Sequence, residues 1–122
     1  MAQSLATTVE TDSMNWVTVC ALDAITPNTG VNALIGKEQV AIFRIGATDE
    51  VYAMGNFDPF SKAFVMSRGI VGDRQGVLKV ASPIYKQNFN LKTGVCLDDE
   101  TISLPVYPVR IADKQIQIGA NG

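Results

Sequence analysis

Histidine is absent from this chain of 122 residues. Because histidine is the usual general base near neutral pH and the commonest metal ligand in proteins, its absence removes several kinds of chemistry at once. A Ser-His-Asp triad, a Cys-His pair, a catalytic zinc site and a haem with a proximal histidine are all excluded within this chain. The composition therefore favours a role in which the protein contacts a partner.

Cysteine is scarce as well, since Cys20 and Cys96 are the two in the sequence. They lie far apart and form no Cys-x-x-Cys pair, so a disulfide-rich scaffold is not indicated. A disulfide between them stays open. Each lies in a short apolar stretch, however, and we expect two reduced thiols that behave as small hydrophobic side chains.

Long hydrophobic runs and clusters of charge are also missing. No segment approaches the length of a membrane span, and residues 1–13 lack the basic start and apolar centre of a signal peptide. The net charge is -2 and the lysines and arginines are scattered, so no surface for nucleic acid or an anionic membrane is expected. We predict a cytoplasmic protein with a flexible N-terminal tail at 1–13, no nucleic-acid partner and no membrane partner.

The remainder, 14–122, is predicted to form one all-β domain. A hydrophobic content of 47% suits a packed core. Short apolar runs separated by turn residues recur about every eight to twelve residues, which is typical of antiparallel sandwiches and barrels. A loop-like region is expected at 55–76, and at most a single helical turn. Strands are predicted at 16–20, 31–35, 39–45, 51–54, 77–81, 88–91, 95–97, 107–111 and 115–118.

Two segments of this domain carry a pattern of their own. The first reads Asn-Phe-Asp-Pro-Phe at 56–60, and the second runs from Ser-Pro-Ile-Tyr at 82–85 to Thr-Gly at 93–94. Here the sequence resembles the Rieske ferredoxin family, whose loops read Asn-x-Cys-Pro-His and Cys-Pro-x-His-x-x-x-Phe-x-Leu-x-Thr-Gly. The resemblance implies a Rieske-like antiparallel β-sandwich or barrel over 14–122. The residues that frame the loops match the family: Asn56, Pro59, Pro83, Phe89, Leu91, Thr93 and Gly94.

The residues at the family's four ligand positions differ from the family. These residues are Asp58, Phe60, Ser82 and Tyr85. A Rieske cluster needs two thiolates and two imidazoles, and a phenylalanine has no atom that can ligate iron. The two cysteines lie outside both loops. We therefore expect no cluster, no other cofactor and no metal in this chain.

A Rieske-like domain of this length without the ligands is similar to the small subunits of the cytoplasmic NAD(P)H-dependent nitrite reductase. The likeness runs from Trp16 to Ile118, and its most specific segments are 56–60 and 82–87. In that family of oxidoreductases, the large subunit carries FAD, an iron–sulfur cluster and sirohaem, and reduces nitrite to ammonium in nitrate assimilation. The resemblance implies a small, cluster-free subunit that docks on the large subunit and supports it, with no catalytic residues of its own.

Apolar side chains in and beside the two loops have two roles open to them. They can fill the volume that a cluster would take, or form an exposed patch that contacts a partner. Packing is favoured for Phe57 and Phe60, whereas the sequence does not separate partner contact from simple exposure for Tyr85 and Lys86. The hypothesis is that the paired loop tips form the docking face. Its candidate residues are Phe57, Phe60, Phe64, Ile84, Tyr85 and Lys86.

Other groups of polar residues give weaker evidence of a functional site. Asp58 and Ser82 have no base to activate the serine, so we expect both to bond to the loop backbone. The acidic run 98–100 is expected to be a solvated hairpin end. Two rival functions stay open: an electron-transfer ferredoxin, which the missing ligands oppose, and a free-standing Rieske-like module that binds a small ligand or a protein and has no redox role.

Overall fold

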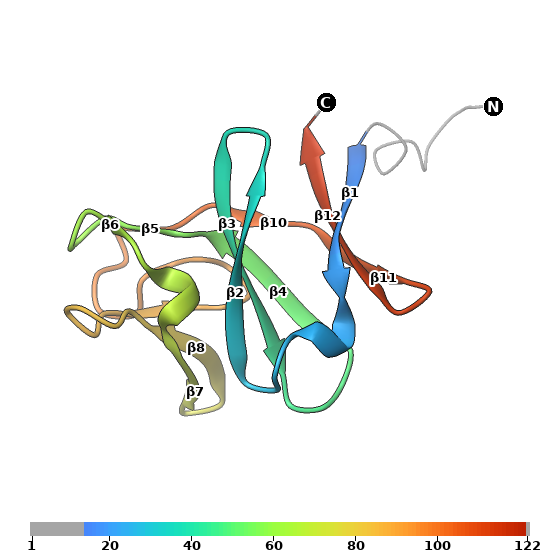
Figure 1. Ribbon diagram of the computed structural model, residues 1–122. Helices are drawn as coiled ribbons and strands as arrows, with labels where there is room; N and C mark the ends of the chain where they lie inside the picture. The colour runs from blue at the N-terminus through green and yellow to red at the C-terminus, as the bar shows by residue number, and fades with distance from the viewer. Residues whose placement is uncertain (1–13, 122) are drawn as a thin grey trace, which may run out of the picture.

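Strands make up most of the protein, as the sequence predicted (Figure 1). The structure is a computed structural model that describes residues 14–121, so the predicted tail at 1–13 lies outside the described residues. The elements are β1 (Met14–Ala21), η2 (Leu22–Ala24), β2 (Thr29–Ile35), β3 (Glu38–Ile45), β4 (Glu50–Gly55), β5 (Phe57–Asp58), β6 (Ala63–Phe64), η3 (Met66–Arg68), β7 (Ile70–Arg74), β8 (Val77–Ala81), β9 (Asn88–Asn90), β10 (Val106–Tyr107), β11 (Val109–Ala112) and β12 (Gln115–Asn121).

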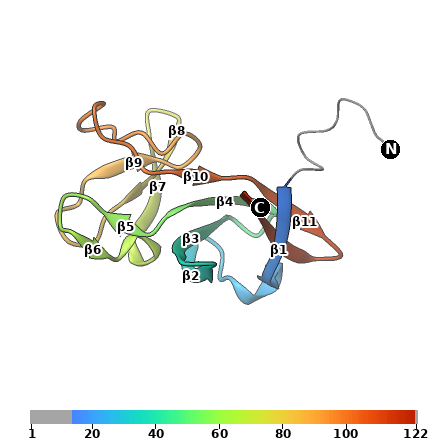
Figure 2. The ribbon, with the colours of Figure 1, turned by 90° about the horizontal axis from the view of Figure 1, so that it is seen from above.

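The strands form antiparallel sheets that divide the molecule into two halves. A three-stranded sheet β1-β12-β11 and a four-stranded sheet β10-β4-β3-β2 make the larger half. The hairpin β5-β6 and the three-stranded sheet β7-β8-β9 make the smaller half. Figures 1 and 2 agree in placing β5 to β9 at one end of the molecule and β1, β11 and β12 toward the other. The predicted all-β antiparallel architecture is confirmed.

Strand β3 is buried on both faces. Its residues alternate, as strand geometry requires, between two hydrophobic clusters. Ala41 and Phe43 belong to a cluster shared with the smaller half, while Val40 and Ile42 belong to a cluster shared with β12. The sheet that contains β3 is therefore the middle layer of the protein, and it fixes the smaller half to the larger one.

A charged residue also lies within β3. Arg44 is buried, and its guanidinium donates hydrogen bonds to the carbonyl oxygens of Ile25 at 3.1 Å and Thr48 at 2.9 Å. It lies 3.6 Å from the exposed carboxylate of Asp23. Because a buried guanidinium needs partners for its donors, these carbonyls account for its position. Arg44 thereby holds the segment after β1 against the sheet.

The predicted loop at 55–76 is more structured than the sequence indicated. It contains the β5–β6 hairpin, the η3 turn and the whole of β7. Strand β7 pairs with β8 through the turn Gln75-Gly76, whose φ angles of 53° and 86° are both positive. Positive φ at both central residues is the mark of a type I′ hairpin, and glutamine at the first of them gives little sequence signal. The expectation of a plain loop was wrong for this segment.

The predicted hairpin around Lys92-Thr93-Gly94 is confirmed in part. Strand β9 is its first arm, but the second arm makes isolated bridges, Phe89 with Cys96 and Val95 with Ser103. The predicted closing hairpin is present as β11 and β12, joined through Asp113 and Lys114.

The described chain enters and leaves the domain side by side, since Met14 pairs with Asn121 at the open end of the β1–β12 ladder. Within residues 14–121, no helix is both long and apolar enough to cross a membrane.

Gly94 offers a test of how tightly this hairpin is packed. Its φ is +80°, and an added Cβ would lie 2.1 Å from the carbonyl oxygen of Leu104. We expect Gly94→Ala to cost more than the roughly 1–2 kcal/mol of a left-handed backbone alone, because the clash is with backbone that cannot swing away. Urea unfolding would measure the loss.

Gly76→Ala is the matched control, because Gly76 has a φ of +86° and nothing within 4 Å of an added Cβ. Equal losses of stability in the two variants would contradict the close packing of Gly94 against Leu104.

Candidate functional site

A buried hydrogen bond joins the two loops that the sequence singled out. Asp58 lies in β5 and Ser82 directly follows β8, and both side chains are fully buried. The Ser82 hydroxyl donates to Oδ2 of Asp58. The sequence predicted that both residues bond to loop backbone. Asp58 does so, but the two side chains also bond to each other across 24 positions of sequence.

The Asp58 carboxylate accepts further hydrogen bonds within its own loop. Its Oδ1 accepts from the backbone N–H of Phe60 at 2.9 Å, and its Oδ2 accepts from the Ser61 hydroxyl at 2.8 Å. Burial acts to raise the pKa of Asp58, but the hydrogen bonds from Ser82, Phe60 and Ser61 outweigh it, so its pKa lies below the ordinary value. Asp58 is thus a buried, fully bonded carboxylate that holds both loops.

Asn56, one of the framing residues, makes hydrogen bonds with both its side chain and its backbone. Its side-chain amide donates to Oε1 of Gln39 at 3.1 Å, and its Oδ1 accepts from the backbone N–H of Ser67 at 2.7 Å. Its backbone N–H also donates to the carbonyl of Gln39 at 3.0 Å. Asn56 therefore ties the first loop to β3 and to η3.

The framing residues of the second loop act within the core. Phe89 and Leu91 belong to the cluster that contains Phe43, and Gly94 has the positive φ that the sequence predicted. The Thr93 hydroxyl accepts a hydrogen bond from the backbone N–H of Val95 at 3.2 Å. Each of these residues has a structural role that needs no bound group.

The residues at the four ligand positions do not fit a Rieske cluster. Asp58 and Ser82 stand at the first ligand position of each loop. They bond directly to each other, which leaves no space for an iron between their oxygens. Phe60 offers no donor atom, and Tyr85 offers a phenol where the family has an imidazole. Cys20 and Cys96 lie in β1 and at the Phe89 bridge, and both are free thiols. Among residues 14–121, no three His, Cys, Asp or Glu side chains gather as a metal site requires.

The structure separates the six docking candidates into two groups. Phe60 is half-buried, and its ring centroid lies 6.1 Å from that of the core residue Phe89. The remaining five are exposed. Phe57 and Phe64 lie on the paired strands β5 and β6, and the other three lie in the β8–β9 loop: Ile84, Tyr85 and Lys86.

A groove of about 330 Å³ runs beside Phe57 and Phe64. The β5–β6 hairpin forms one of its walls, with Asn56, Phe57, Pro59 and Phe64. The β2–β3 turn and the segment before β10 supply other walls, which sequence reasoning missed. The residues that it did not single out are Lys37, Glu38, Gln39, Ser103, Leu104 and Pro105. The spacing of residues in the sequence does not indicate that these six lie together. By contrast, the Asp58-x-x-Ser61 pattern is a common turn motif, and it could have indicated Ser61 as a hydrogen-bond partner of Asp58.

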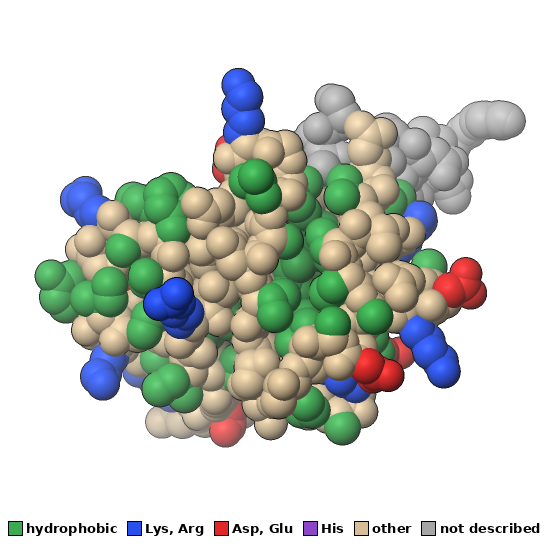
Figure 3. Space-filling model, in the orientation of Figure 1, with side chains coloured by type: hydrophobic (Ala, Val, Ile, Leu, Met, Phe, Trp, Pro, Cys, Tyr) green, Lys and Arg blue, Asp and Glu red, His purple; other side chains and the backbone are tan. Residues whose placement is uncertain are grey.

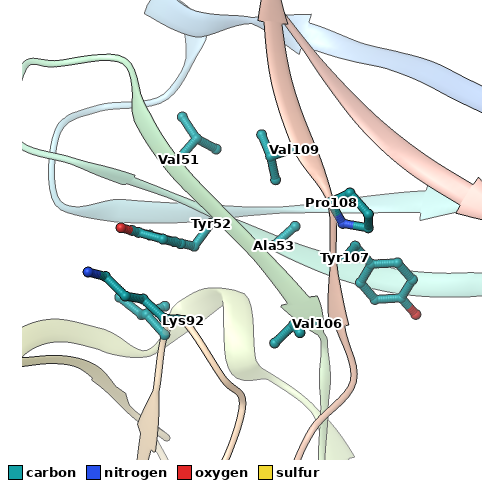
Figure 4. Close-up of a pocket in the computed structure, with 9 residues that line it drawn as sticks. Val51, Tyr52, Ala53, Lys92, Val106, Tyr107, Pro108 and Val109 are labelled. Atoms are coloured by element: carbon teal, nitrogen blue, oxygen red, sulfur yellow. The ribbon is translucent and has the colours of Figure 1, made fainter. Parts of the chain in front are cut away.

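A second hollow, of about 400 Å³, lies between β4 and the β10–β11 segment (Figure 4). Val51 and Val109 face each other across it, and Lys92 reaches toward Tyr52 at its edge. The Tyr52 hydroxyl donates to Glu50. Burial, that hydrogen bond and the negative charge of Glu50 raise the pKa of Tyr52 to about 12. The hydroxyl is therefore engaged within the protein, and the hollow lacks the free, convergent polar groups of a typical ligand site.

The fold and the two framed loops define the class of protein as a Rieske-like domain. Residues 15–119 match the family described as Rieske-like [2Fe-2S] domain. The chain is 48% identical over 103 residues to the nitrite reductase (NADH) small subunit of Escherichia coli strain K12, which covers 84% of this chain and 95% of that protein.

Structural comparison gives the same relatives. The solution structure of the nitrite reductase small subunit from Erwinia carotovora is similar with a TM-score of 0.76 and 46% identity, over 88% of this chain and 82% of that one. The chain is also 39% identical over 107 residues to the NAD(P)H nitrite reductase large subunit of Klebsiella oxytoca, which covers 88% of this chain but 11% of that protein. This chain therefore belongs, among Rieske-like domains, to the family of nitrite reductase small subunits.

The buried carboxylate gives the site a pH-dependent test. Because the folded pKa of Asp58 lies below its unfolded value, the stability it contributes is present above about pH 4 and is lost as pH falls through the folded pKa. We expect Asp58→Asn to lower the free energy of unfolding by about 1–3 kcal/mol at pH 7. This difference in unfolding free energy between wild type and the variant should narrow as pH falls from about 5 to about 2, because the wild-type carboxylate becomes protonated. Urea unfolding at a series of pH values measures both effects.

Asp99→Asn is the control, since Asp99 also has a lowered pKa but is an exposed residue bonded to its neighbour Thr101. It should leave the unfolding midpoint nearly unchanged. A gap between wild type and Asp58→Asn that stays constant across this pH range would show that the carboxylate is not held as described.

Proposed function

We propose that this chain is the small, non-catalytic subunit of a cytoplasmic NAD(P)H-dependent nitrite reductase that forms ammonium from nitrite in nitrate assimilation. The observation that carries the proposal is the near 50% identity to nitrite reductase small subunits over the whole domain, including both loops. The FAD, iron–sulfur cluster and sirohaem of such an enzyme belong to the large subunit, on which this chain docks.

The relationship to the Klebsiella protein supports a large-subunit partner. In that organism a domain similar to nearly all of this chain forms part of a polypeptide named as the large subunit. A domain that is separate in some relatives and joined in another works next to the same partner in both cases. The small domain therefore has its function in contact with the large subunit.

The chemistry of the loops supports a non-catalytic role. The one buried carboxylate there is occupied by three hydrogen-bond donors, and the Ser82 hydroxyl is committed to that carboxylate. Neither group is free to accept a proton from a substrate or to attack one, and the chain has no histidine to assist. Electron transfer and nitrite reduction then take place in the large subunit.

Co-expression tests this function. The chain and the sirohaem-containing large subunit from the same source would be produced together, with the large subunit produced alone as the control. We expect a stable complex, and nitrite-dependent NAD(P)H oxidation that falls several-fold when this chain is left out. No association together with unchanged turnover would contradict the proposal and favour the free-standing binding module.

Iron content tests the cluster-free state separately. We expect the purified chain to be colourless, with iron far below the two atoms per chain of a Rieske cluster, because the four ligand positions supply no thiolate and no imidazole. A Rieske ferredoxin produced in the same host is the control for cluster loading. Stoichiometric iron and the visible spectrum of a cluster would contradict this expectation.

A further inference from the structure

Two phenylalanines form an exposed, ordered pair on the β5–β6 hairpin, which we name the aromatic shelf. Phe57 and Phe64 are direct cross-strand partners, and their ring centroids lie 5.0 Å apart at an angle of 58°. Their exposed fractions are 39% and 57%. Successive strand residues face opposite sides, so the burial of Asp58 turns Phe57 outward. The hydrogen bonds of Asp58 therefore hold the shelf in place.

The shelf borders the groove described above, so an apolar surface and a concave one adjoin. Phe57 and Phe64 line the groove on one side, and Leu104 and Pro105 line it as well. Exposed aromatic side chains beside a groove are typical of protein–protein contacts, because rings that are already ordered lose little entropy on binding.

Charge near the shelf differs in sign from the whole chain. Lys62 is exposed at the turn of the β5–β6 hairpin, whose one acidic residue, Asp58, is buried. Across the groove, Lys37 and Glu38 are both exposed, so the exposed charges bordering the shelf and groove are two basic and one acidic. The net charge of the chain is -2. Figure 3 shows lysine and arginine side chains around the hydrophobic ones at the end of the molecule where β5 to β9 lie. A complementary partner would be apolar at the centre and acidic at the rim.

The relationship to the Klebsiella protein indicates the partner of this chain. Figure 1 shows the start of β1, the end of β12 and the β2–β3 turn along its upper edge. Figure 2 looks onto this face, with the β5–β6 hairpin beside the β2–β3 strands. In the Klebsiella protein, the remainder of the large subunit must join the domain through these ends. Since the start of β1 and the end of β12 lie toward the opposite end of the molecule from β5 and β6, this join leaves the β5–β6 end free to contact the rest of the large subunit.

We propose that the aromatic shelf and the groove beside it are the principal surface by which this chain contacts the nitrite reductase large subunit, through an apolar patch with an acidic rim on that subunit. This inference rests on the proposed function and assigns the contact to one part of the loop end. The β8–β9 loop, with Ile84 and Tyr85 exposed by 46% and 63%, is the rival surface. It contributes no residue to the groove.

Matched double variants separate the two surfaces. Phe57→Ser with Phe64→Ser removes the shelf, and Ile84→Ser with Tyr85→Ser removes a comparable apolar surface from the neighbouring loop. Each would be co-expressed with the tagged large subunit, and the dilution at which half of the small chain dissociates would be measured by gel filtration. We expect a shift of at least tenfold for the shelf variant, and less than twofold for the loop variant.

Two further variants guard against loss of folding and against unspecific adhesion. Phe64→Ser alone changes the more exposed ring and should weaken the complex while the thermal midpoint of the free chain stays unchanged. Ser103→Phe adds apolar surface inside the groove. It should also weaken the complex, because it blocks the groove. Raising the salt concentration should weaken the wild-type complex further, because the rim of the surface is basic.

Several outcomes would overturn the inference. One is a loop variant that weakens the complex as much as the shelf variant does. Another is a shelf variant that folds and binds like wild type. A third is a concentration-dependent dimer of this chain alone that the shelf variant abolishes, since the surface would then join two copies. If wild type forms no complex at all, the proposed function fails first. A wild-type complex that tolerates the shelf variant leaves the function intact and refutes the surface.

Discussion

The carboxylate of Asp58 is the group on which the loop end of this protein depends. A buried charge is tolerated only where donors surround it, and here the donors come from both loops: Phe60 and Ser61 from the first and Ser82 from the second. The loops must therefore sit in one arrangement for the carboxylate to be satisfied. That arrangement turns Phe60 toward the core and leaves Phe57 outside. One polar cluster thus decides which aromatic rings pack in the core and which are exposed.

This cluster acts on a frame that is built around β3. The strand contributes to both hydrophobic clusters, so the loops are joined to the most buried sheet of the molecule. Asn56 connects the first loop to the central sheet, because its hydrogen bonds reach Gln39 in β3 and the backbone of η3. Asp58 lies two residues further on. The position of the loop end relative to the core is therefore fixed by hydrogen bonds over a short span of chain.

Sequence patterns predicted the parts of this structure that depend on local chemistry. The alternation in β3, the closing hairpin and the positive φ of Gly94 follow from strand periodicity and turn residues, and all are present. The β7 strand was not predicted, because glycine and charged residues weaken its pattern and Gln75 hides the turn. The Ser82–Asp58 bond and the Gln39–Asn56 bond join residues that no spacing rule relates. Both loops could be located from the sequence, but which of their aromatic rings are buried and which are exposed could not be predicted.

The same frame explains why family membership and cofactor content are separate questions here. The residues that carry the resemblance to Rieske domains act inside the protein: Asn56 bonds to the sheet, Phe89 and Leu91 fill the core, and Gly94 makes a turn that a Cβ would block. Phe89 also packs against the ring of Phe60, which stands at one of the four ligand positions. A match to the family therefore indicates the shared arrangement of strands and core residues, in which a hydrogen bond from Ser82 to Asp58 joins the two loops. Since that bond joins the loops on their buried side, the exposed residues Phe57 and Phe64 take no part in it and can differ in chemistry without breaking it.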